Sequence, residues 1–188
     1  MRPAAIVIGA SAGGPAALQV LLSRLEKNLS AAVVIVNHIG SQGPDLLADI
    51  LAPCCALPVR LAREREQVTS GMVHIAPSGY HLLVERSFHF SLSVDARVHF
   101  SRPAIDMLFE SAAMAYGRQL AALVLTGASE DGATGLAMVR REGGTALVQS
   151  PGEAAFKTMP QAAIDIAGAD ICAPVEDLAD HLNRLCHS

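Results

Sequence analysis

The sequence predicts an α/β fold: a doubly wound, mostly parallel sheet with helices on both faces and an inserted β-hairpin. Two observations support this class. Short β-branched runs alternate with amphipathic stretches of about 10 residues or more, which is the rhythm of βαβ units. Some runs, such as LAALVLT at 120–126, are apolar at nearly every position, as strands covered on both faces are. The 188 residues are the size of one domain, which we expect to span 1–188.

The first part of the chain alternates between strands and helices. Pro15 stands at a first helical position, and the leucines behind it recur at i, i+3, i+4 and i+7, which predicts a helix with one buried stripe. The expected elements are a strand at 4–8, a turn at 9–14, a helix from Pro15, a strand at 32–37, a helix from Pro44 to about Leu51 and a short strand near 59–62.

The middle of the chain differs in character. Three short strand-like runs, 73–76, 81–85 and 88–94, are separated by turn residues. We therefore expect a hairpin or a small meander inserted between α/β units.

The last part returns to alternating strands and helices. Apolar residues spaced as on one helix face predict a helix at 103–116. The remaining expected elements are a strand at 120–126, a small-residue loop at 127–135, a helix at 136–141, a strand at 145–149, a helix at 159–167, an edge strand at 171–173 and a surface helix at 175–186.

Charge and composition exclude several functions. The net charge of −4 disfavours binding to nucleic acid. No apolar run approaches the roughly 18 residues that a membrane-spanning helix needs, so we expect no membrane insertion. The four cysteines have neither metal-ligand spacing nor a disulfide pattern, which predicts reduced thiols in a cytoplasmic protein and no metal site. The oligomeric state is not determined by these patterns.

Polar residues that suit catalysis follow three of the predicted strands. Ser11 lies in the turn after the first strand, His38 follows the second, and Asp131 lies in the loop after 120–126. Because open parallel sheets bind ligands beyond the carboxyl ends of their strands, we expect these side chains at one edge of the sheet.

Together these three residue types are those of a serine hydrolase. The segment from Gly9 to Gly13 is a Gly-x-Ser-x-Gly pattern, which is typical of a nucleophile on a sharp strand-to-helix turn. A serine hydroxyl needs a base that titrates near pH 7, such as the His38 imidazole, and a buried carboxylate such as Asp131 to orient that base. Each residue also has a purely structural interpretation, as a glycine-rich turn, a hydrogen-bonded histidine and a turn aspartate.

The remaining histidines have no nucleophile near them in this arrangement, and we interpret them as structural. They are His74, His81, His89, His99, His181 and His187.

A nucleotide-binding module is an alternative from another class, because 9–14 also resembles a phosphate-binding turn. Two details argue against it. Ser11 occupies a glycine position of the Gly-x-Gly-x-x-Gly pattern, and the second strand ends in Asn37 and His38 rather than in an acidic ribose ligand.

Six segments together resemble the catalytic domain of CheB-type chemotaxis methylesterases, from about Ala5 to Leu178. They are IGASAGGPAAL (8–18), VIVNHIG (34–40), GMVHIAPSGYHLLV (71–84), RPAIDMLFESAA (102–113), LVLTGASEDGATGL (123–136) and FKTMPQAAI (156–164). The resemblance implies a protein-glutamate methylesterase that removes methyl groups from glutamate methyl esters on chemoreceptor cytoplasmic helices. It also implies that some members deamidate receptor glutamines, and it places the triad on Ser11, His38 and Asp131.

The resemblance has further implications. The reaction requires no cofactor, and the backbone N–H groups of Ala12 and Ala128 are the candidate donors to the oxyanion. The receptor would contact a rim that includes 102–106 and 152–159. The family usually carries an N-terminal receiver domain, whereas this chain begins its first strand near residue 4, so we expect a stand-alone catalytic domain.

Several residues depart from the family pattern without removing a triad member. They include Ala12 in place of threonine, Asn37 in place of glutamine and Ser101 in place of histidine. The alternative that they raise is a catalytically weak scaffold of the same fold that binds a receptor or a regulator.

Overall fold

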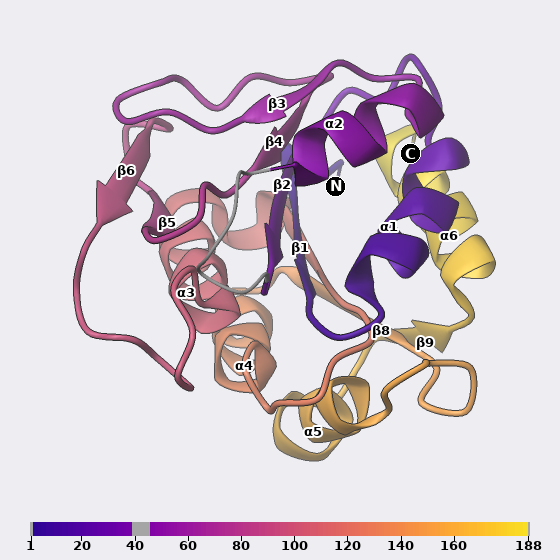
Figure 1. Cartoon of the computed structure of the whole chain (residues 1–188). Helices are drawn as coiled ribbons and strands as arrows, with labels where there is room; N and C mark the ends of the chain where they lie inside the picture. Colours follow the sequence, from indigo (N-terminus) through magenta and orange to yellow (C-terminus); the bar gives the residue numbers. More distant parts are fainter. Residues whose placement is uncertain (1, 39–45, 188) are drawn as a thin grey trace.

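A sheet of seven parallel strands forms the centre of the computed structural model, which describes residues 2–38 and 46–187 (Figure 1). In spatial order the strands are β3 (Val59–Leu61), β4 (Val73–Ile75), β2 (Ala32–Asn37), β1 (Ala5–Ala10), β7 (Leu120–Val124), β8 (Thr145–Gln149) and β9 (Ile171–Ala173). Each neighbouring pair in this sheet is parallel. The predicted α/β class is confirmed.

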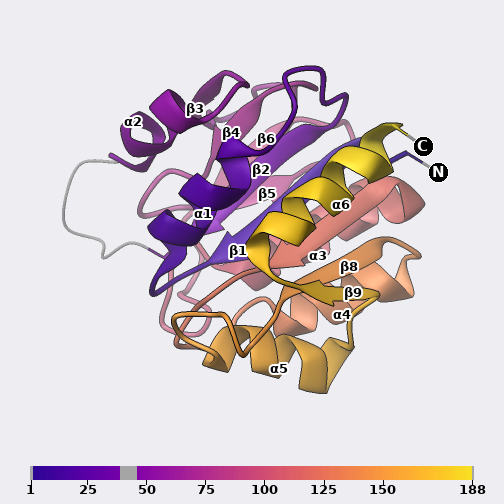
Figure 2. The same cartoon turned by 90° about the vertical axis from the view of Figure 1, so that its right-hand side faces the viewer.

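Helices cover both faces of this sheet, so that the molecule has three layers (Figure 2). One face carries α1 (Gly14–Ser23), α2 (Leu47–Leu51) and α6 (Val175–His187), and the other carries α3 (Ile105–Tyr116), α4 (Ala133–Arg141) and α5 (Thr158–Ala167). Short 3₁₀ turns at Ala52–Cys54 and Gly117–Gln119 follow α2 and α3. Within the described ranges, none of the helices has the length and apolar character needed to cross a bilayer.

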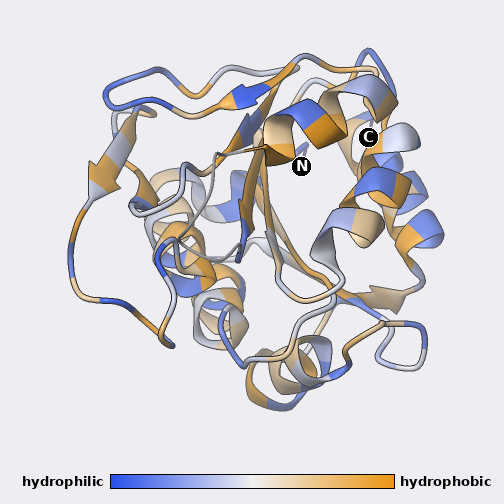
Figure 3. Ribbon diagram, viewed as in Figure 1, coloured by the Kyte–Doolittle hydropathy of each residue, from blue (hydrophilic) through white to orange (hydrophobic). Residues whose placement is uncertain are grey.

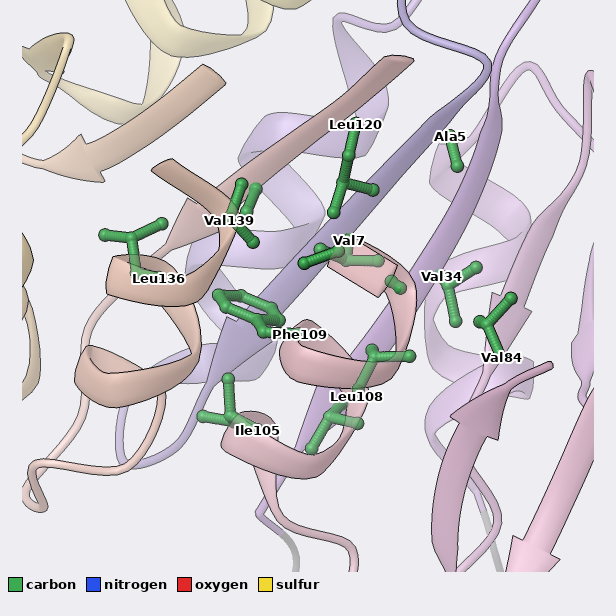
Figure 4. Packing of buried hydrophobic residues seen from close by; sticks show 14 of the residues in the cluster. Ala5, Val7, Val34, Val84, Ile105, Leu108, Phe109, Leu120, Leu136 and Val139 are labelled. Carbon is green, nitrogen blue, oxygen red and sulfur yellow. The ribbon is translucent and has the colours of Figure 1, made fainter. Parts of the chain in front are cut away.

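The alternation of side chains along each strand divides the core into two parts. In β1, Val7 belongs to the cluster under α3 and α4, whereas Ile6 and Ile8 belong to the cluster under α1 and α6. Figure 4 shows Val7 close to Phe109 of α3, and the strands in Figure 3 are mostly coloured as hydrophobic. Each fully buried side chain of this size stabilises the fold by about 1.5–3 kcal/mol.

The middle of the chain contains the expected hairpin but not a meander. β5 (His81–Val84) and β6 (Phe90–Ser93) pair antiparallel, and the Val84 N–H donates to Ser111 Oγ of α3 at 3.1 Å. The run at 73–76 is instead β4, a strand inside the main sheet and parallel to both of its neighbours. The prediction missed this because β4 has only three residues, although all three are buried.

Several helices begin at other residues than predicted. α4 begins at Ala133 rather than at 136, because Gly132 adopts a left-handed φ of 95° and so turns the chain into the helix. The helix expected from Pro103 begins at Ile105. The predicted surface helix, α6, buries one face against the sheet. The start predicted at Pro44 lies outside the described residues.

The order of the strands reverses beside β1. The chain passes from β1 to β2 on one side and later returns to β7 on the other side. α1 follows β1 onto one face of the sheet, whereas α4 follows β7 onto the opposite face. The space beyond β1 and β7 is therefore the topological switch point, at which open α/β sheets bind their ligands.

Candidate active site

The structure places Ser11, His38 and Asp131 at the switch point. Ser11 directly follows β1 and His38 directly follows β2. The last residues of these two strands, Ala10 and Asn37, are register partners, and the His38 N–H donates to the Ala10 carbonyl at 3.0 Å. Asp131 lies 93 residues beyond His38, in the loop between β7 and α4. The parallel register therefore makes Ser11 and His38 neighbours across adjacent strands.

Ser11 occupies a tight turn between β1 and α1. Its N–H donates to the Thr126 carbonyl at 3.0 Å, and its own carbonyl accepts from Gly14 N–H at 2.7 Å. Gly13 has a φ of 77°, and a Cβ at Gly14 would lie only 2.0 Å from Asn37 Oδ1. The glycines behind Ser11 are therefore required by the turn and by its close approach to β2, as in a nucleophile turn.

His38 and Asp131 form a short, buried hydrogen bond. His38 Nε2 lies 2.7 Å from Asp131 Oδ2, with the His38 side chain 11% exposed and the Asp131 side chain fully buried. This contact leaves Nδ1 of the ring for a second partner. Ser11 Oγ makes no hydrogen bond to the ring in the structure as described, and such bonds often tighten only when substrate binds.

Asp131 is held as a carboxylate by the start of α3. Its Oδ2 accepts the Ile105 N–H at 2.7 Å and its Oδ1 accepts the Asp106 N–H at 2.9 Å. Burial acts to raise the pKa of Asp131, but the hydrogen bonds from His38 and from these two backbone groups outweigh it, so that the pKa lies below its usual range. A carboxylate in this state fixes the tautomer of the imidazole and stabilises the imidazolium.

A second buried aspartate, Asp106, supports the loop of Asp131. Its Oδ1 accepts the Gly132 N–H at 2.9 Å and the Gly135 N–H at 2.7 Å. Burial is the main reason why the pKa of Asp106 is raised, and the nearby negative charge of Asp131 adds to it. The sequence analysis placed this residue in the receptor rim 102–106 but gave it no role beside Asp131, although an acidic group in the first turn of a predicted helix was a usable signal.

His99 contacts two acidic residues near Asp131, which the sequence did not reveal, while its interpretation as a structural residue stays a prediction. Its Nε2 lies 3.2 Å from Asp106 Oδ2 and its Nδ1 lies 3.8 Å from Glu130 Oε1. By contrast, His74 and His81 are fully buried and hydrogen-bonded within the fold, as expected of structural residues.

His99, Asp106 and Asp131 are residue types that can bind a metal ion. One ligand atom from each of His99, Asp106 and Asp131 lies within 4.8 Å of the others. However, all four carboxylate oxygens already accept N–H hydrogen bonds from His38, His99 or the backbone. The two aspartates are therefore satisfied without a cation.

The two predicted oxyanion donors stand in the loops that follow β1 and β7, which leave the sheet at the same edge. The N–H groups of Ala12 and Ala128 donate to no described residue. Thr126 ties the two loops together, since its hydroxyl donates to the Ala12 carbonyl at 2.9 Å and accepts the Phe156 N–H at 2.9 Å. This arrangement suits the stabilisation of an oxyanion, in which the donors must be fixed in place before the charge develops.

Comparison with known proteins agrees with this geometry. Residues 6–182 match the family model described as CheB methylesterase. The chain is 42% identical over 185 residues to a putative protein-glutamate methylesterase/protein-glutamine glutaminase of Leptospira interrogans, covering 98% of this chain and 96% of that protein. It is also 35% identical over 179 residues to the protein-glutamate methylesterase/protein-glutamine glutaminase of Symbiobacterium thermophilum, and the match covers 49% of that protein.

A solved structure shares the fold. The crystal structure of the Thermotoga maritima CheB methylesterase catalytic domain matches with a TM-score of 0.92 and 31% sequence identity. The match covers 98% of this chain and 100% of that chain. The likeness therefore extends over the whole sheet and its helices.

Proposed function

The chain belongs to the CheB methylesterase family and is a protein-glutamate methylesterase, and on this basis we propose that Ser11, His38 and Asp131 carry out the reaction. The observation that supports the assignment is the 2.7 Å hydrogen bond between His38 and Asp131 beside the turn of Ser11. A buried carboxylate, an imidazole and a serine at one switch point form the arrangement that acyl transfer requires.

The proposed reaction begins when Nδ1 of His38 takes the proton of the Ser11 hydroxyl. The serine oxygen attacks the carbonyl carbon of the methyl ester, and the negative charge on the carbonyl oxygen is held by the N–H groups of Ala12 and Ala128. His38 then returns the proton to the leaving oxygen, and methanol departs. Water, activated by His38, hydrolyses the acyl-enzyme and restores Ser11.

The substrate in this proposal is a glutamate methyl ester on a methyl-accepting chemoreceptor, met in the cytoplasm. The same machinery can attack the side-chain amide of a receptor glutamine, with ammonia as the leaving group, as the names of the relatives from Leptospira and Symbiobacterium indicate for those proteins. Loss of one oxyanion donor would slow either reaction by about 10²–10³.

Methanol release from a methylated receptor tests the proposal. We expect the wild type to release methanol and Ser11→Ala to release none, while both unfold at the same temperature. Equal release by the two proteins would overturn the assignment of the nucleophile. Release by neither, with the receptor still bound, would identify a scaffold instead of an enzyme.

A further inference from the structure

Two exposed phenylalanines flank the proposed catalytic residues from separate loops. Phe100 lies in the segment 94–102 between β6 and α3, here called the arm, and is 94% exposed. Phe156 lies in the loop 150–157 between β8 and α5 and is 47% exposed. Single exposed apolar residues are ordinary on protein surfaces, so the meaning of these two depends on how they are held and on what lies between them.

The arm holds Phe100 in solvent by a network of its own. Val98 and Ser101 form an antiparallel bridge with N–H···O distances of 3.1 and 2.8 Å. The Arg102 guanidinium donates to the carbonyls of Val94 and Asp95 at 2.7 and 2.9 Å. These contacts define the path of the arm on both sides of the ring.

The backbone at the tip of the arm is strained. His99 and Phe100 have φ values of 47° and 62°, a region that non-glycine residues rarely adopt. No described residue packs over the Phe100 ring, since nearly all of this residue is exposed to solvent. Strain that brings no packing within the chain is characteristic of functional positions.

Hydrogen bonds connect both loops to the catalytic residues. On the side of the arm, His99 contacts Asp106, whose own N–H binds Asp131. On the other side, the Phe156 N–H binds Thr126 Oγ1, which in turn binds the carbonyl of Ala12. In Figure 1 the arm lies to the left of the β1–α1 turn, and the orange loop after β8 lies to its right. A rod-shaped partner that spans the arm and this loop therefore crosses the β1–α1 turn, in which Ser11 lies.

Each of the two loops also has an exposed cation near its phenylalanine in the chain. Arg97 Nη1 donates to the Phe100 carbonyl at 3.4 Å, and exposed Lys157 directly follows Phe156. The acidic groups nearby are engaged within the fold: Asp95 accepts from Ser93, Glu153 from Gln149 and the Val175 N–H, and Glu130 faces His99. Neither Arg97 nor Lys157 forms an ion pair among the described residues, so both cations can pair with glutamates of a segment that also has an apolar stripe.

We propose that Phe100 and Phe156 are docking residues that receive the apolar stripe of a glutamate-rich helix of the protein substrate, with Arg97 and Lys157 beside its acidic side chains. This inference rests on the proposed function, because the ester must be carried to Ser11 by that helix. Apolar residues at i, i+3, i+4 and i+7 form such a stripe, and an esterified glutamate on the same side of the helix is then directed toward the serine.

The test compares a protein substrate with a probe that needs no docking. For each full-length variant, kcat/KM for methanol release from a methylated chemoreceptor cytoplasmic fragment is divided by the rate at which a small fluorophosphonate labels Ser11. We expect Phe100→Ala to lower this ratio about tenfold or more, Phe156→Ala to lower it less, and Phe100→Leu to restore part of it. Phe88→Ala is the control for loss of an exposed phenylalanine at a positive φ, because Phe88 has a φ of 60° but lies in the β5–β6 turn, where its ring packs on Tyr116. This variant should keep the wild-type ratio even though it loses that packing.

An unchanged ratio in Phe100→Ala would overturn the docking role, as would an equal loss in Phe88→Ala. If the wild type releases no methanol, the proposed function fails, and docking is then decided by binding of the same fragment to Ser11→Ala. We expect that binding to weaken about tenfold when Phe100→Ala is added to Ser11→Ala, and binding that is absent or unaffected would contradict the inference.

Discussion

Asp131 and Asp106 are linked by reciprocal hydrogen bonds: each carboxylate accepts from backbone N–H groups at the start of the helix beside the other residue. Asp131 binds the first N–H groups of α3, whereas Asp106, in the first turn of α3, binds the N–H groups of Gly132 and Gly135 at the start of α4. The two buried carboxylates therefore lock the two helix starts together. These reciprocal hydrogen bonds fix the position of Asp131 next to His38. The backbone N–H groups that donate to Asp131 also favour its charged form.

Replacing Asp131 by Asn should preserve the fold and remove most of the activity. The amide keeps one oxygen for the start of α3 but no longer holds the imidazole in the required tautomer, so methanol release should fall by about 10³–10⁴. Asp177→Asn, on the exposed side of α6, is the control and should retain full activity. A rate within tenfold of the wild type in Asp131→Asn would contradict the role of this carboxylate.

Replacing Asp106 by Ala should destabilise the protein. Two buried N–H groups, of Gly132 and Gly135, would lose their acceptor, at a cost of about 1–3 kcal/mol each. Asp106→Asn keeps an acceptor oxygen and should lose clearly less. Urea unfolding measures the difference, and equal stability of Asp106→Ala and wild type would show that these contacts contribute nothing.

The opposite pKa directions of the two aspartates predict opposite pH effects on stability. Because the pKa of Asp131 is lowered, the unfolded chain binds the proton first. Its contribution is therefore complete above about pH 4 and is lost as the pH falls through the native pKa. Because the pKa of Asp106 is raised, the folded chain binds the proton first, and stability from this group increases as the pH falls through its native pKa toward about 4.

Denaturation at several pH values checks both signs. The advantage in unfolding free energy of wild type over Asp131→Asn should shrink below about pH 4, whereas wild type relative to Asp106→Asn should gain stability as the pH falls from 7 toward about 4. A parallel pH dependence for the two comparisons would refute the assignment.

Replacing Gly14 by Ala should disturb the turn of Ser11. The new Cβ would lie 2.0 Å from Asn37 Oδ1, so the buried Asn37 side chain or the start of α1 must shift, and both stability and the labelling rate of Ser11 should fall. Gly152→Ala is the control, since its nearest neighbour lies at 3.9 Å. Combining Gly14→Ala with Asn37→Ala should recover part of the lost stability and labelling rate. If neither recovers, the contact with Asn37 is not the cause of the loss.

Local patterns in the sequence were sufficient for the fold class and for most elements. β2, β8 and β9 have the predicted bounds, and for β8 and β9 the runs end at the turn residues Ser150-Pro151 and Pro174. β4 was misassigned because a three-residue strand does not reveal which neighbour it pairs with. The early start of α4 depends on the left-handed Gly132 and on the distant Asp106, which local helical periodicity cannot show.

The candidate site was predictable only in part. Strand exits and residue chemistry were enough to select Ser11, His38 and Asp131, and the structure joins the last two directly. The contacts of Asp106 and His99 near Asp131 were missed because they form across the fold, between the arm, α3 and the loop before α4.

The hydrogen bond between His38 and Asp131 joins residues 93 positions apart, which follow the strands on either side of β1. During synthesis, a ribosome-bound chain that has not yet released β7 has a serine and a histidine but no acid to orient them. Ester cleavage by this protein should therefore appear only once β2, β1 and β7 have assembled, which makes turnover a reporter of the assembly of these central strands.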